Sequence, residues 1–128
     1  MKSNIENHID PDLQINYNIL KGTVVLDMLL DYLKNLVAAP GYNDTYNVLV
    51  DIREGDFPDF FERMDEFIQF FLSSPKEINW RRKCAIVTAN KQHAVISFWL
   101  KDKMEKLKFD LFVEVFSTEE AAVKWLTN

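Results

Sequence analysis

Charged side chains follow the most apolar strand-like run of the sequence, and they are the residues best placed for chemistry. The run Val48-Leu49-Val50 is followed by Asp51, Arg53, Glu54 and Asp56. Carboxylates in such a place can hold a hard cation such as Mg²⁺, and an Arg side chain can clamp an anionic ligand or a partner's carboxylate through two hydrogen bonds. The alternatives are solvated acids and an ion pair that only orders the chain. We expect these four residues to form an interaction loop, without a metal.

Other patterns of catalysis or metal binding do not appear in the sequence. His8 and His93 lack the second His, Cys or spaced carboxylates of a zinc site. Ser97 and Ser117 lie inside or at the start of predicted helices, and neither belongs to a nucleophile elbow. Cys84 lies in an apolar strand pattern without a cation at a helix start to lower its pKa, which indicates a buried structural thiol. We therefore expect a protein that is not an enzyme and has no catalytic residue and no cofactor.

Apolar side chains exceed what one face of a sheet covers on two predicted helices. Six of the ten Phe residues lie between positions 57 and 71, and the segment 94–100 is apolar on most sides. Surplus apolar surface favours either a pocket for an apolar or lipid-like ligand between these two helices, or a homodimer interface. The homodimer is the simpler alternative because it needs no cavity, and we expect a homodimer that buries part of the apolar surplus of residues 57–71 and 94–107. The pocket remains the other alternative. The candidate residues for either one are Phe57, Phe60, Phe70, Phe98 and Trp99.

Hydrophobic periodicity predicts the elements that must position these residues. Alternation at Ile15, Tyr17 and Ile19 is typical of a half-buried strand, whereas apolar residues spaced by three or four indicate helices. The predicted order is β-β-α-β-α-β-α-β-α, over residues 5–9, 15–19, 26–37, 47–52, 60–72, 84–88, 91–107, 111–116 and 117–126. Alternating strands and helices are the mark of an α/β fold.

We expect a single domain over residues 1–128, with a five-stranded mixed sheet packed with about four helices. The first strands are predicted to run antiparallel to the rest. The central strands are predicted at Val48–Ile52 and Cys84–Thr88. Asp59, followed by Glu62, is expected to begin the Phe-rich helix, because a side-chain acceptor three residues before Glu is typical of a capping box.

Composition and charge exclude several classes of protein. Hydrophobic residues make up 48% and charged residues 27%, as in ordinary globular proteins. A net charge of −5 argues against a nucleic-acid partner, which needs an excess of Lys and Arg. The sequence shows no run long enough for a transmembrane segment, and its polar start does not fit a secretory signal. The lone Cys84 suits a reducing compartment, so we expect a cytoplasmic protein.

Charge is also distributed unevenly along the chain. Acidic residues concentrate in 51–66, and basic residues concentrate in 81–83 and 101–108. Two such regions can meet across a homodimer or receive a charged protein partner. The alternative is that they form the solvated outer faces of two helices.

Several strings of the sequence resemble the SpoIIAA-like family of the STAS superfamily, which is often grouped with CRAL-TRIO lipid-binding domains. They are Gly22 before a Leu-rich helix, the run Val48–Glu54, the run Ala85–Val87 and the ending Val115–Leu126. The resemblance covers nearly the whole chain. It implies a mixed sheet with helices and a non-enzymatic role in regulation or binding.

The sequence departs from the anti-sigma-factor antagonists of that superfamily at the position of their phosphorylated Ser. At the place of their Asp-Ser-Ser-Gly motif this chain reads Asp51-Ile52-Arg53-Glu54-Gly55-Asp56-Phe57, and no Ser occurs between Thr45 and Ser73. No phosphorylation site is therefore expected at this position. The leading expectation is a STAS-like protein-interaction module that acts through the loop after the central strand, and the alternative is a binder of an apolar or lipid-like ligand.

Overall fold

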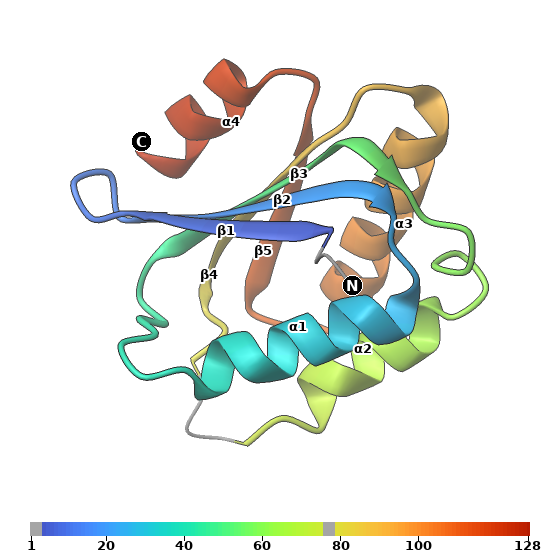
Figure 1. Cartoon of the computed structure of the whole chain (residues 1–128), viewed down its shortest axis with the longest axis horizontal. Coiled ribbons are helices and arrows are strands. Elements are labelled where there is room, and N and C mark those ends of the chain that lie inside the picture. The colour runs from blue at the N-terminus through green and yellow to red at the C-terminus, as the bar shows by residue number, and fades with distance from the viewer. Residues whose placement is uncertain (1–3, 76–78) are drawn as a thin grey trace.

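The computed structural model describes residues 4–75 and 79–128 and contains one five-stranded mixed sheet with four helices in the described part of the chain (Figure 1). The predicted order of strands and helices is confirmed. The elements are β1 (Ile5–Asp10), β2 (Ile15–Thr23), α1 (Leu26–Ala38), β3 (Asn47–Asp56), α2 (Met64–Leu72), β4 (Arg82–Val87), α3 (Lys91–Lys106), β5 (Leu111–Phe116) and α4 (Glu119–Leu126).

The strands lie side by side in the order in which they occur in the chain, β1-β2-β3-β4-β5. β1 is antiparallel to β2, whereas β2, β3, β4 and β5 are parallel to one another. The prediction that the first strands run antiparallel to the rest is therefore wrong for β2. The reason is α1, since a helical crossover brings the chain back to begin the next strand in the same direction. The predicted central strands are confirmed as β3 and β4.

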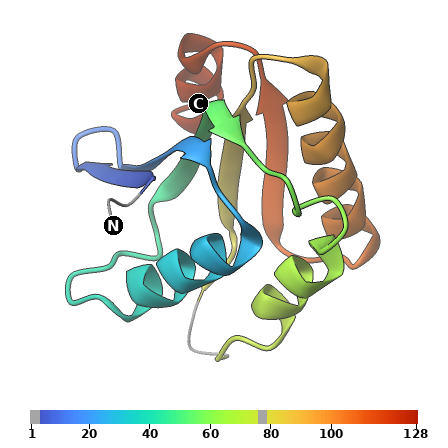
Figure 2. The same ribbon diagram turned by 45° about the vertical axis from the view of Figure 1, so that its right-hand side comes forward.

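Helices cover the two faces of the sheet unequally (Figures 1 and 2). The larger core contains residues of α1, α2 and α3, such as Leu26, Phe67 and Leu100. The smaller core lies on the other face, where Ala122 and Leu126 of α4 are buried. From β2 to β5, each crossover leads to the next strand on the same side of the previous one. Because such crossovers are right-handed, their helices α1, α2 and α3 all lie on one face of the sheet. Only α4, which follows the last strand, covers the other face.

β3 is longer and α2 shorter than predicted. After a register shift between Ile19 and Lys21, the end of β2 pairs with the end of β3, so that Thr23 lies opposite Asp56. The expected loop after the central strand is thus part of a strand. α2 begins at Met64, because the carboxylate of Asp59 does not cap it and instead accepts the backbone N–H of Leu26 at 2.9 Å.

A side-chain cap marks the start of α4. The side-chain oxygen of Thr118 accepts the backbone N–H of Ala121 at 3.2 Å. A threonine at this position satisfies one of the N–H groups that have no partner within the helix. The cap fixes where the chain turns from β5 into the helix that covers the second face.

Candidate functional site

An apolar cavity of about 150 Å³ lies between the sheet and the three helices on its larger face. Val48 and Val50 of β3 and Ile86 of β4 form part of its floor. Its other walls include Leu29 and Leu33 of α1, Phe67 and Phe71 of α2, and Ile96, Leu100 and Met104 of α3. A cavity of about this size lined by Leu, Ile and Phe is known to stay dry and to bind benzene or xenon.

The wall formed by α1 is only loosely packed. Leu26 is the one fully buried residue of this helix. Leu29, Leu33, Leu36 and Val37 line the cavity, but all four keep part of their surface exposed. The apolar stripe of α1 is therefore not fully used by packing against the sheet.

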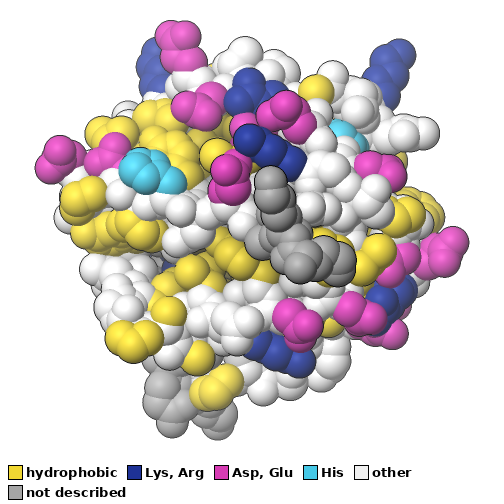
Figure 3. All heavy atoms as spheres, viewed as in Figure 1, with side chains coloured by type: hydrophobic (Ala, Val, Ile, Leu, Met, Phe, Trp, Pro, Cys, Tyr) yellow, Lys and Arg dark blue, Asp and Glu magenta, His cyan; other side chains and the backbone are white. Residues whose placement is uncertain are grey.

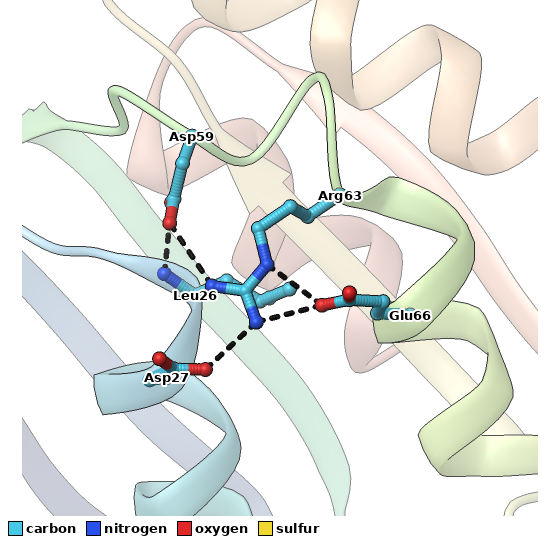
Figure 4. A network of polar contacts seen from close by, with 5 residues as sticks. All are labelled: Leu26, Asp27, Asp59, Arg63 and Glu66. Atoms are coloured by element: carbon cyan, nitrogen blue, oxygen red, sulfur yellow. Dashed lines mark hydrogen bonds and ion pairs between the residues drawn. The ribbon is translucent and has the colours of Figure 1, made fainter.

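Arg63 ties α1 to the start of α2 (Figure 4). Its guanidinium forms ion pairs with Asp27 of α1 at 2.8 Å, with Asp59 at 3.2 Å and with Glu66 of α2 at 2.6 Å. Asp59 also accepts the N–H of Leu26. The hydrogen bonds that Arg63 donates to these carboxylates raise its pKa above the usual value. The network holds the two walls at a fixed spacing.

Two of the predicted pocket residues border the cavity. Phe60 is buried and Phe57 is partly buried, and both contribute to the lining. The ring of Phe57 packs edge-on against the ring of His93, with centroids 5.5 Å apart. It also lies over Gly55, where a Cβ atom would be only 2.6 Å from the ring. The missing side chain at position 55 is what admits Phe57 to this place.

The other predicted pocket residues lie elsewhere. Phe70 packs against Phe71 and Trp80 at the end of α2 and does not line the cavity. Phe98 is 52% exposed on the outer side of α3. Trp99 packs against the exposed Phe61, with ring centroids 4.4 Å apart. The predicted set is therefore divided between the cavity, the end of α2 and the outer surface.

A polar cluster lines one side of the cavity. Asn16 and Asn18 of β2 are buried, and the hydroxyl of Tyr32 on α1 donates to Oδ1 of Asn18. Nδ2 of Asn7 donates to Oδ1 of Asn16 at 2.5 Å and to Oδ1 of Asn18 at 3.2 Å. Burial raises the pKa of Tyr32 to about 12, so its hydroxyl stays neutral. These groups satisfy one another and join α1 to β2.

Arg82 brings a charge to the wall of the cavity at the start of β4. It is only 5% exposed. Nη1 donates to the hydroxyl of Tyr42 at 2.8 Å, and Nη2 donates to the backbone oxygen of Asn79. The guanidinium also lies 5.5 Å from the ring centroid of Trp80. Among the described residues, no side chain or backbone atom accepts a hydrogen bond from Nε, and no carboxylate forms an ion pair with this group.

Sequence reasoning missed Arg82 because it stands in the basic run 81–83, which suggests a solvated surface. The alternation of β4 carries the signal that was overlooked. Arg82, Cys84 and Ile86 line the cavity, whereas Lys83 and Ala85 point to the face covered by α4. Burial raises the pKa of the Cys84 thiol to about 12, which fits an unreactive, protonated thiol.

The predicted interaction residues lie at the opposite end of the sheet from Arg82. Arg53 donates to both carboxylate oxygens of Asp51, at 3.0 and 2.8 Å. Burial raises the pKa of Asp51, but the hydrogen bonds from Arg53 outweigh it, and the pKa lies below its usual value. The Arg53 guanidinium also lies 3.8 Å from Glu119 of α4, while Glu54 and Asp56 are exposed. In the described ranges, no group of three His, Cys, Asp or Glu residues is arranged to hold a metal ion.

The chain is similar to known proteins in both sequence and fold. The family model described as SpoIIAA-like matches residues 21–127. The chain belongs to the SpoIIAA-like family. A crystal structure of an uncharacterized protein from Shewanella loihica with a SpoIIAA-like fold is similar, with a TM-score of 0.59, 17% sequence identity and 98% of each chain covered. No curated protein matches the chain.

Membership places this protein in a STAS-like family of regulatory or interaction modules, whose members are generally not enzymes. The resemblance inferred from the strings of the sequence is thereby confirmed for family and fold. None of the helices in the described part of the SpoIIAA-like chain is long and apolar enough to cross a membrane.

Proposed function

We propose that this SpoIIAA-like protein is a non-catalytic binding module for a small apolar ligand, which it holds in the cavity between the sheet and α1, α2 and α3. The observation that carries the proposal is the cavity itself, with a volume of about 150 Å³ and an almost wholly apolar lining. By comparison with the benzene held by a cavity of about this size, the buried part of the ligand has about six carbon atoms. The lone Cys84 supports a reducing, cytoplasmic setting.

Nuclear magnetic resonance of methyl groups tests the proposal directly. Titration with benzene should shift the methyl signals of Leu29, Val50 and Ile86, which line the cavity. The matched control is on the other face of the sheet, where the methyl signals of Leu49 and Val87 belong to the smaller core and should not move. Uniformly small shifts on both faces, together with an organic extract of the purified protein that contains no apolar compound, would contradict the proposal.

A second candidate function is protein interaction through Asp51, Arg53, Glu54 and Asp56. The specific observation in its favour is that Asp51 holds the exposed Arg53 in place by two hydrogen bonds, beside the exposed carboxylates. A preordered guanidinium loses little freedom when it binds a partner's carboxylate. A partner captured by the wild type should be lost with Arg53→Ala and kept with Arg81→Ala, another exposed arginine. Equal capture by both variants would exclude this surface.

The exposed aromatic residues on the outer side of α3 support the proposal of a homodimer. Phe61 and Phe98 are each 52% exposed, and Trp99 lies against Phe61. Figure 3 shows the face seen in Figure 1, on which hydrophobic side chains gather in patches with acidic and basic ones around them. Light scattering should give a dimeric mass that Phe98→Asp reduces to a monomeric one. The control is Phe112→Asp, which changes a phenylalanine of similar exposure on β5. A monomeric wild type at moderate salt would refute the homodimer.

A further inference from the structure

Arg82 is a buried cation whose charge the described residues do not neutralise. Transfer of a charged side chain into the protein interior is strongly unfavourable unless an opposite charge or several hydrogen bonds compensate for it. Arg53 and Arg63, in contrast, form ion pairs with carboxylates and are considerably more exposed. Arg82 is 5% exposed and has no such partner among the described residues. The described residues therefore leave this buried charge without a counter-charge, which is unusual for a protein interior.

The compensation that the fold does provide is partial. Tyr42 and Asn79 each accept one hydrogen bond, and the rings of Tyr42 and Trp80 lie 5.7 and 5.5 Å from the guanidinium carbon. A guanidinium has five N–H donors in a planar fork, and these contacts use two of them. Nε is buried and has no acceptor in the described part of the chain. The guanidinium thus keeps N–H donors for which the described residues supply no acceptor.

The position of Arg82 connects this charge with the cavity. Arg82 belongs to the cavity lining, and no Asp, Glu or Lys is found among the described lining residues. His93 is the other titratable base there, and it lies at the start of α3, near the opposite end of β4. The lining is therefore largely apolar, with the polar cluster of β2 and α1 on one side and a positive charge at the end formed by Arg82, Tyr42 and Trp80.

We infer that the natural ligand is an amphipathic monocarboxylate, whose carboxylate pairs with Arg82 while its hydrocarbon part fills the cavity. This inference rests on the proposed function and names the chemical class of its ligand. A carboxylate has the planar shape that an Arg fork binds through two hydrogen bonds. Its single charge also matches a single guanidinium, whereas a phosphate monoester would bring a second negative charge into an apolar site.

Calorimetric titration with hexanoate and with hexan-1-ol near neutral pH separates the charge from the hydrocarbon. Hexanoate should bind the wild type, and Arg82→Met should weaken its binding by about tenfold to a hundredfold, the range expected for a lost hydrogen bond between charged groups. The same substitution should leave hexan-1-ol binding unchanged or make it tighter. Lys83→Met is the matched control, because Lys83 points to the α4 face, where Nζ donates to the backbone oxygen of Trp125 at 3.0 Å.

The two proposals fail in different ways. If hexan-1-ol and benzene bind but hexanoate binds no more tightly than hexan-1-ol, the carboxylate inference is overturned and the apolar site stands. If none of the three binds, both are overturned. Should Arg82→Met not fold, the Nε–H resonance of Arg82 in the wild type gives the same answer: hexanoate should shift it downfield and hexan-1-ol should not, and an unmoved resonance would overturn the inference.

Discussion

Replacing Cys84 with leucine should stabilise the protein, because this side chain borders the cavity. Cys84 is buried on the larger face of β4 and belongs to the cavity lining. Leucine has two more non-hydrogen atoms in its side chain than cysteine. The neighbouring cavity of about 150 Å³ provides the space for them. The substitution thus adds apolar contact without displacing the residues around it.

The expected gain follows from the size of the added group. Burial of each added methylene-sized group contributes about 0.8 kcal/mol, or about 1.6 kcal/mol for the two. Ordering the leucine side chain costs about 0.5–1 kcal/mol, which leaves about 1 kcal/mol. The empty cavity of about 150 Å³ destabilises the fold by about 3.6 kcal/mol at most, at about 24 cal/mol per Å³. The expected gain in stability is smaller than this upper limit. With an unfolding entropy of about 2.1 cal/mol/K per residue, Tm should rise by about 4 °C.

Thermal unfolding followed by circular dichroism provides the assay, and Ala85 provides the control. Ala85 is the next residue of β4, is 0% exposed and packs in the smaller core against α4. Ala85→Leu adds a larger group where the chain is tightly packed and should destabilise the fold by about 1–3 kcal/mol. The two adjacent substitutions should therefore change Tm in opposite directions. A decrease for Cys84→Leu as large as that for Ala85→Leu would refute the cavity.

Three further substitutions test other parts of the structure. Arg63→Ala should lower Tm and speed amide hydrogen exchange in the first turn of α1, because it removes the network shown in Figure 4. Arg81→Ala, which changes an exposed arginine, should alter neither quantity. Equal exchange rates in the two variants would contradict the role of the network. Asp51→Asn should lower the free energy of unfolding measured in urea at about pH 7, and this difference from the wild type should vanish as the pH falls toward about 2. The reason is that the pKa of Asp51 is lower in the folded than in the unfolded protein. The ionised carboxylate therefore stabilises the fold above its unfolded pKa, and this stabilisation is lost as the pH falls through the folded pKa. Thr118→Ala should cost about 1 kcal/mol in urea unfolding by removing the cap of α4, whereas Ser117→Ala should cost little, and equal losses would disprove the cap.

Local patterns were sufficient to predict the order of the elements and the central strands. The continuous apolar run Val48-Leu49-Val50 identifies a strand covered on both faces, and the structure places it between α4 and the cavity. The direction of β2 could not be deduced from its own residues. It depends on which edge of the sheet the crossover through α1 reaches, and that is a property of the whole fold.

The errors concern residues whose partners are distant in the sequence. Glu54 and Asp56 favour a loop by propensity, but pairing with Lys21–Thr23 extends the strand through them. Asp59 has the spacing of a helix cap, but its carboxylate accepts a hydrogen bond from the backbone N–H of Leu26, which is 33 positions away. Neither partner is visible in a local window of sequence.

The candidate site was predicted only in part, for a related reason. The excess of apolar residues correctly indicated Phe57 and Phe60, which line the cavity, but it also indicated Phe98, which faces outward. Helical spacing alone does not tell which side of an over-apolar helix meets the sheet. Arg82 was overlooked because a charged residue at the start of a strand is usually solvated, and only its alternation with Cys84 and Ile86 indicates otherwise.

The strand order also has a consequence for how the chain folds during synthesis. From β2 onward, each strand pairs with the strand made just before it, so the sheet can grow by one unit at a time as the chain leaves the ribosome, without waiting for a distant partner. The smaller core is the exception. Leu49 and Ala85 are buried only once α4 has returned to cover them, and until then the nascent sheet presents an apolar face. A nascent chain that is stalled before α4 should therefore be the form that chaperones recognise.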